Sequence, residues 1–157
     1  MKFLISKDRK PSVLLKLLMA NVMVAILFYI LLDIFLHAYI LGFDIATVKA
    51  NIFGDEENFI EPILLETLLL QVHIDIFMSL IAVMILSSVY IRYHSEQKQS
   101  KIFVHLFLFS ALVSPIILLL SFFTNMMLVY LYIFMYALWH ILAFIMASLN
   151  LKRLWFS

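Results

Sequence analysis

Four long apolar stretches divide the chain, and short polar segments separate them. They cover approximately residues 13–41, 62–91, 102–123 and 126–151. Each stretch reaches the ~20 residues that a helix needs to cross the ~30 Å of hydrocarbon in a bilayer. Glycine occurs only twice and proline three times, so little interrupts these stretches as continuous helices. The pattern predicts a single all-α integral membrane domain over residues 1–157, built as a bundle of four transmembrane helices.

Composition supports a membrane protein and excludes several kinds of chemistry. Of the 157 residues, 66% are hydrophobic and 13% are charged, whereas soluble domains are roughly half apolar and one quarter charged. The chain has no cysteine, which excludes disulfides, iron–sulfur clusters and cysteine-based zinc sites. The net charge is only +1, and the basic residues lie at the membrane edges. We therefore expect the lipid bilayer as a partner and no nucleic acid.

The distribution of charge predicts how the chain lies in the membrane. Lys49 is the one basic residue in the connection between the first two stretches, and the others lie at the opposite edge: Lys2, Lys7, Arg9, Lys10, Lys16, Arg92, Lys98, Lys101, Lys152 and Arg153. That first connection is instead acidic, with Asp44, Asp55, Glu56, Glu57 and Glu61. Because basic loops stay on the cytoplasmic side, we predict a cell-membrane protein with both termini in the cytoplasm.

The acidic external loop has the signals of a short helix. Asp44 can cap its start and Gly54 can end it. Three apolar residues between these two ends share one helical face: Ile45, Val48 and Ile52. We therefore expect a short interfacial helix that lies on the outer leaflet.

Polar side chains at membrane depth are the main candidates for function, because burying ionisable groups in lipid is costly. The spans carry several of them: Asp33, His37, Glu66, Gln71, His73, Asp75 and His140. Asp33 and His37 are four residues apart and share one face of the first helix. Glu66 and His73, seven apart, share a face of the second helix. We expect these residues and His140 to converge in the outer half of the bundle.

Asp75 is expected to lie apart from this convergence. It follows His73 by two residues and therefore points almost oppositely on the same helix. Two alternatives remain open for it. It can face the serines of the third span, Ser110, Ser114 and Ser121, or it can stay protonated in an apolar setting. Pro115, beside the middle serine, should kink the third helix and free a backbone carbonyl.

Two kinds of bound group fit these residues. His73 and His140 have expected depths that differ by only ~4 Å at ~1.5 Å per residue, and two facing imidazoles can bind the iron of haem b. Asp33, His37 and Glu66 form the alternative, a mixed set that suits a non-haem metal ion such as zinc, manganese or iron. Either group predicts a redox or metal-binding function, with electron transfer as the role of haem or of a redox-active ion.

Two other functions stay open at this point. The chain can be a non-catalytic structural or assembly subunit whose polar groups satisfy one another, with other membrane subunits or a second copy as partners. It can also be part of an ion- or proton-coupled transporter, since acids and histidines relay charge across membranes. No serine lies in a nucleophile elbow, and no helix carries a pair of histidines spaced for zinc. Whether the protein is an enzyme is left open.

Overall fold

The computed structural model describes residues 13–94 and 98–156, and their regular structure is helical apart from one isolated β-bridge between Asp55 and Ile60. The elements are α1 (Val13–Ile40), α2 (Ile45–Phe53), α3 (Leu65–His94), α4 (Lys98–Phe123) and α5 (Met127–Phe156). Four of them, α1, α3, α4 and α5, are long and apolar enough to cross a membrane. The prediction of an all-helical membrane protein with four spans is confirmed.

The ends of the helices differ from the predicted ends by a few residues. α3 begins at Leu65 and not at Pro62, and its first turn is closed by a hydrogen bond from the amide of Leu68 to the carbonyl of Leu64. α5 continues to Phe156, beyond the predicted end at residue 151. A helix can extend past the apolar layer here because its last turns carry the exposed charged side chains of Lys152 and Arg153.

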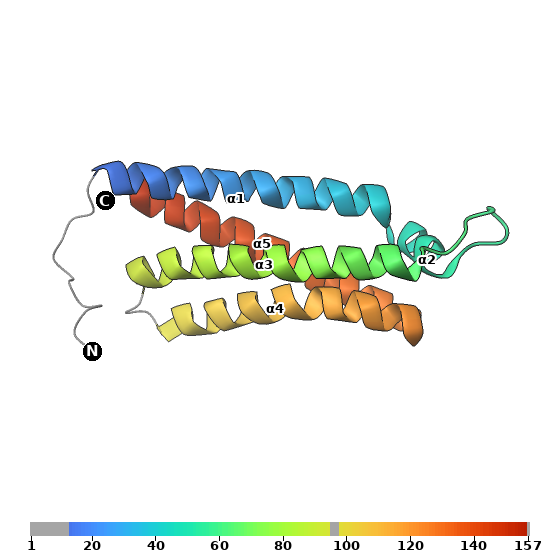
Figure 1. The fold of residues 1–157 in the computed structure, drawn as a ribbon. Coiled ribbons are helices and arrows are strands. Elements are labelled where there is room, and N and C mark those ends of the chain that lie inside the picture. The colour runs from blue at the N-terminus through green and yellow to red at the C-terminus, as the bar shows by residue number, and fades with distance from the viewer. Residues whose placement is uncertain (1–12, 95–97, 157) are drawn as a thin grey trace.

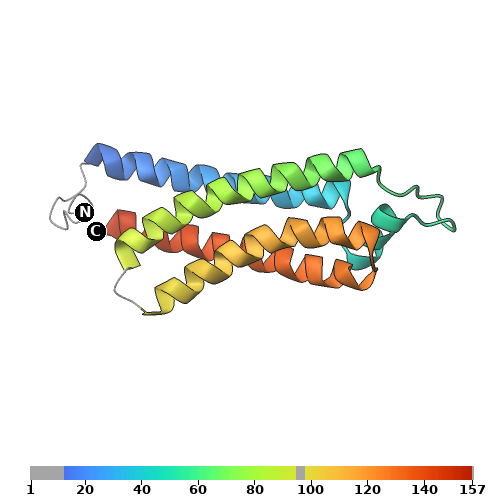
Figure 2. The same cartoon turned by 60° about the horizontal axis from the view of Figure 1, so that its bottom comes forward.

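The four long helices form an elongated bundle (Figures 1 and 2). One end of the bundle holds the start of α1, the end of α3, the start of α4 and the end of α5. Helix α2 lies at the other end. α4 packs against α3 and α5, and α1 packs mainly against α5. α1 and α3 make few close backbone contacts. This arrangement places the predicted external loop opposite the basic end, while the cytoplasmic location of the termini stays a prediction.

Helix α2 forms as its capping residues predict, and protein covers two of the three residues of its apolar face. The Asp44 carboxylate accepts a hydrogen bond of 2.9 Å from the amide of Thr47, and Gly54 ends the helix with φ +83°. Val48 and Ile52 are buried against the end of the bundle, whereas Ile45 is 39% exposed, so only Ile45 of this face is open to the outer leaflet. Burying these side chains against other apolar side chains removes them from water and needs no lipid.

Two apolar clusters fill the bundle, one toward each end. The cluster at the basic end is centred on residues such as Met23, Leu86 and Met146. The cluster at the α2 end includes Leu68 and Val129. On α1, α3 and α5 the polar residues of the spans lie mainly between the two apolar clusters. The fold thus places a polar layer between two apolar ones.

Candidate metal centre

Three helices each present a polar stripe to this layer. On α1 the stripe is Tyr29, Asp33 and His37; on α3 it is Gln71, Asp75 and Ser79; on α5 it is Tyr132, Tyr136 and His140. Within every stripe the residues are four apart, so they stack one turn above another on one helical face. The stripes therefore bring acids, imidazoles and hydroxyls together from elements that are distant in sequence.

The first ion pair joins α1 to α3. Nε2 of His37 lies 3.0 Å from Oδ2 of Asp75. The side-chain amide of Gln71 donates a 2.8 Å hydrogen bond to the other oxygen of Asp75. Because α1 and α3 have few close backbone contacts, this polar bridge is a principal connection between them.

The second ion pair joins α1 to α5. Nε2 of His140 lies 2.9 Å from Oδ2 of Asp33. The hydroxyl of Tyr136 donates to the same carboxylate oxygen and to the backbone carbonyl of Asp33, both at 3.3 Å. The Tyr29 hydroxyl reaches Oδ1 of Asp33 at 3.5 Å. Asp33 is thus surrounded by hydrogen-bond donors, as a carboxylate removed from water requires.

Hydrogen bonds to the backbone fix the tautomer of both histidines. Nδ1 of His37 lies 3.0 Å from the carbonyl oxygen of Asp33, and Nδ1 of His140 lies 2.8 Å from that of Tyr136. A carbonyl oxygen only accepts, so in both rings Nδ1 carries the hydrogen. One further proton must then lie between each Nε2 and its aspartate for the contact to be a hydrogen bond. The two pairs, His37 with Asp75 and His140 with Asp33, each hold one shared proton.

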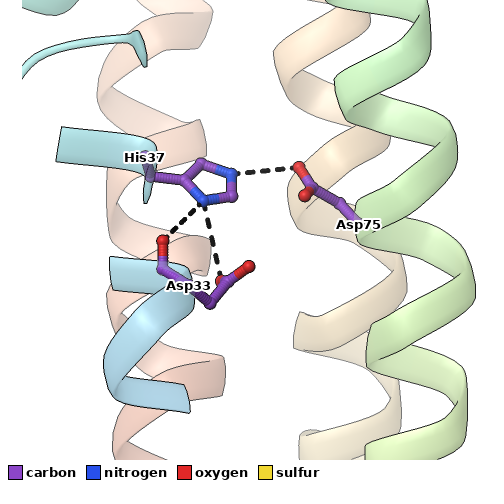
Figure 3. A group of neighbouring side chains, drawn as sticks. All are labelled: Asp33, His37 and Asp75. Carbon is purple, nitrogen blue, oxygen red and sulfur yellow. Dashed lines mark hydrogen bonds and ion pairs between the residues drawn. The ribbon is translucent and has the colours of Figure 1, made fainter. Parts of the chain in front are cut away.

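Asp33, His37 and Asp75 form a group that could hold a metal ion, and their ligand atoms lie within 4.8 Å of one another. Figure 3 shows His37 between the two aspartates, with the Asp75 side chain reaching toward it from α3. Asp33 is 8% exposed and His37 is 5% exposed. Imidazole and carboxylate together are suitable ligands for zinc, manganese or iron.

The structure brings together some of the residues singled out by sequence. Asp33 and His37 share one face of α1, as their spacing predicts, and Nδ1 of His37 lies 3.6 Å from Oδ2 of Asp33. His140 lies in the same buried cluster. Glu66 does not reach it, because it is exposed in the first turn of α3.

The rotation of α3 is the reverse of the one expected. His73 is exposed, while Asp75 points to His37. His73 and His140 therefore do not face each other across the bundle, and the expected position of Asp75 away from the cluster is wrong. The stripe formed by Gln71, Asp75 and Ser79 is the sequence signal that could have found this orientation, since it matches the four-residue spacing on α1.

Comparison with known proteins supports the fold. Residues 42–157 match a sequence family described as a transmembrane helical domain, Aq_1264_TM. The chain belongs to this family. The match includes Asp75 and His140 of the cluster and begins after α1, which carries Asp33 and His37. No curated protein and no solved structure matches the chain.

A pocket leads from the α2 end of this transmembrane helical domain toward the cluster. Its volume is about 380 Å³, and it is lined by His37 and Tyr136 together with mostly apolar residues of α1, α2 and α5. Asp44 also lines it. Hydrogen bonds from the Thr47 amide and then from the Thr47 hydroxyl hold the pKa of the Asp44 carboxyl below its usual value. A negative charge therefore lies beside the pocket at neutral pH.

Proposed function

We propose that the protein binds a metal ion within the membrane through Asp33, His37 and Asp75. The observation that carries this proposal is that their ligand atoms lie within 4.8 Å of one another. His37 and Asp75 come from different helices and are 38 residues apart in the sequence. Placing an ionisable side chain in a bilayer costs free energy, so such a residue within a span indicates a functional site by default. Here two acids and two histidines gather at one level.

The surrounding side chains are suited to hold such ligands in place. Nδ1 of His37 is held by a backbone carbonyl, which leaves Nε2 directed at the site. Gln71 orients Asp75, and His140 orients Asp33. Partners of this kind, one shell outside the ligands, fix ring orientation and raise metal affinity. An ion bound by Nε2 takes the place of the proton shared with Asp75, so binding releases protons.

Electron transfer is the role that we propose for a redox-active ion at this site, within a larger membrane complex. Haem ligation by His73 and His140 stays a prediction from sequence with less support, because His73 is exposed and Nε2 of His140 already pairs with Asp33. The metal site uses residues that already lie close together, since Asp33 lies 3.6 Å from Nδ1 of His37 and Asp75 lies 3.0 Å from Nε2.

A non-catalytic subunit is the second candidate, and one observation favours it. The two ion pairs tie α1 to both α3 and α5, which is also what a purely structural network would do. On this reading the protons shared by the two pairs remain in place, and the exposed apolar faces serve contact with lipid, with other subunits or with a second copy.

Metal titration of the purified protein in detergent separates the two candidates. We expect the chelator-treated wild type to bind one Mn²⁺ or Zn²⁺ by isothermal titration calorimetry. Asp75→Asn should weaken binding by at least about 100-fold, because a neutral amide replaces a charged ligand. Glu66→Gln is the matched control, since it removes an acid from the same helix outside the cluster.

A structural network predicts the opposite pattern. Wild type would then bind no ion at any accessible concentration, while Asp75→Asn would lower thermal stability in the absence of metal and Glu66→Gln would not. That result would exclude the proposed metal site.

A further inference from the structure

A small cavity lies beside the cluster, among α1, α3, α4 and α5. Its volume is about 10 Å³, which on this scale is the space for about one water-sized particle. His37 does not line it, so it is separate from the imidazole side of the metal centre. The residues around it are Tyr29, Asp33, Asp75, Ser79, Ala111, Ser114, Pro115, Tyr136 and Trp139.

Most oxygens of this lining can only accept. The hydroxyls of Tyr29 and Tyr136 donate to Asp33, and the hydroxyl of Ser79 donates to the carbonyl of Ile76. Their hydrogens are therefore directed elsewhere, and lone pairs remain for the cavity. The carboxylates of Asp33 and Asp75 add further lone pairs. Oxygen atoms that turn lone pairs toward one another at short distance repel one another unless a cation or a hydrogen-bond donor lies between them.

Helix α4 adds two oxygens whose usual partners are missing. Ser114 is 2% exposed, and its hydroxyl has no hydrogen-bond partner among the residues that the structure describes. Pro115 has no amide hydrogen, so the carbonyl of Ala111 loses the donor that a regular helix would supply. Both Ser114 and Ala111 line the cavity. A hydroxyl that lines a cavity without a hydrogen bond of its own is free to bind what occupies that cavity.

We infer that this cavity is a second cation site, for one sodium ion held by oxygen atoms alone. Hard cations prefer carboxylate, hydroxyl and carbonyl oxygens. Backbone carbonyls freed where a helix is interrupted coordinate Na⁺ in membrane transporters. This site goes beyond the proposed metal centre, because it uses α4 and does not use an imidazole.

The two sites share the carboxylates of Asp33 and Asp75, so their occupancies are linked. Na⁺ in the cavity neutralises part of the charge that a divalent ion at His37 needs. Linkage is reciprocal, so each cation lowers the affinity of the site for the other by the same factor. Sodium therefore acts on the metal centre without touching His37.

Thermal unfolding of the full-length protein in detergent tests the sodium site without any divalent metal. We expect NaCl to raise the unfolding temperature with a saturable dependence, compared with KCl and choline chloride at equal ionic strength, because a ligand that binds only the folded state stabilises it. Ser114→Ala should move the half-saturating sodium concentration upward by about tenfold, the loss expected for one oxygen ligand to a charged group.

Ser110→Ala is the matched control on the same helix, because the Ser110 hydroxyl donates to the carbonyl of Phe107 and does not line the cavity. It should keep the wild-type sodium response. Ser79→Ala provides a second test of the lining if Ser114→Ala does not fold in choline chloride. Equal unfolding temperatures of the wild type in all three salts would overturn the inference, and the cavity would then be a site for a water molecule. An unchanged sodium midpoint in folded Ser114→Ala or Ser79→Ala would overturn it as well.

Discussion

Asp33 is the residue on which the cluster depends most. Its carboxylate contacts the imidazoles of both His37 and His140 and accepts from two tyrosine hydroxyls. A carboxylate buried in a bilayer is tolerated only when such partners replace water. Removing one partner leaves the other buried and unsatisfied, so the effects of substitutions here cannot be independent.

A double-mutant cycle should detect this dependence. Asp33→Asn and His140→Gln should each lower the free energy of unfolding. The loss in the double variant should be smaller than the sum of the two single losses by about 1–2 kcal/mol. The free energy of unfolding can be measured by titration of detergent micelles with sodium dodecyl sulfate. His140→Gln combined with Glu66→Gln is the control and should be additive to within about 0.5 kcal/mol. Additivity for the Asp33 and His140 pair would mean that their 2.9 Å contact contributes nothing.

Sequence identified most residues of the cluster but not all of its contacts. Asp33, His37 and His140 are rare polar residues in long apolar spans, so composition alone marks them. The inward face that sequence predicts for α3 is wrong, because lipid and the protein core are both apolar and hydrophobic periodicity then says little about helix rotation. The pairing of His37 with Asp75 and of His140 with Asp33 depends on that rotation and on how the helices cross.

At the scale of the elements, the helices are predicted well because the signals are local. The length of each apolar run sets the four spans, and capping residues set the ends of α2. What covers α2 is not a local property. Val48 and Ile52 pack on side chains from the ends of other helices, and no pattern within the loop could distinguish that surface from lipid.

Acidification should weaken the start of α2 through Asp44. Its pKa is lowered in the folded protein, so its stabilising contribution is complete above the unfolded value of about 4 and is lost as the pH falls through the lower folded value. The Thr47 amide resonance in NMR spectra should shift toward a non-hydrogen-bonded position as the pH falls below about 4.

Two variants at Asp44 check the cause of this shift. Asp44→Asn should keep the cap and lose its pH dependence, because an uncharged amide oxygen also accepts from the helix start. Asp44→Ala should show the shifted Thr47 amide at every pH. A wild-type Thr47 amide that does not respond to pH would contradict the role of the ionised carboxylate.

At the scale of the whole molecule, the bundle is a polar layer enclosed by two apolar clusters. α1 packs mainly on α5, and its ion pairs with α3 and α5 come from His37 and Asp33. The pocket lined by His37 extends to the α2 end, which the charge distribution predicts to be external. We therefore predict that ions reach the proposed metal centre from outside the cell.

Pulsed electron paramagnetic resonance of the Mn²⁺-loaded protein tests the metal centre most directly, because it detects nitrogen nuclei bonded to the ion. The account predicts a nitrogen coupling from one imidazole in the wild type, its loss in His37→Gln and its retention in His73→Gln, which alters an exposed histidine of α3. A wild-type spectrum with no nitrogen coupling, or a coupling that persists in His37→Gln, would contradict it.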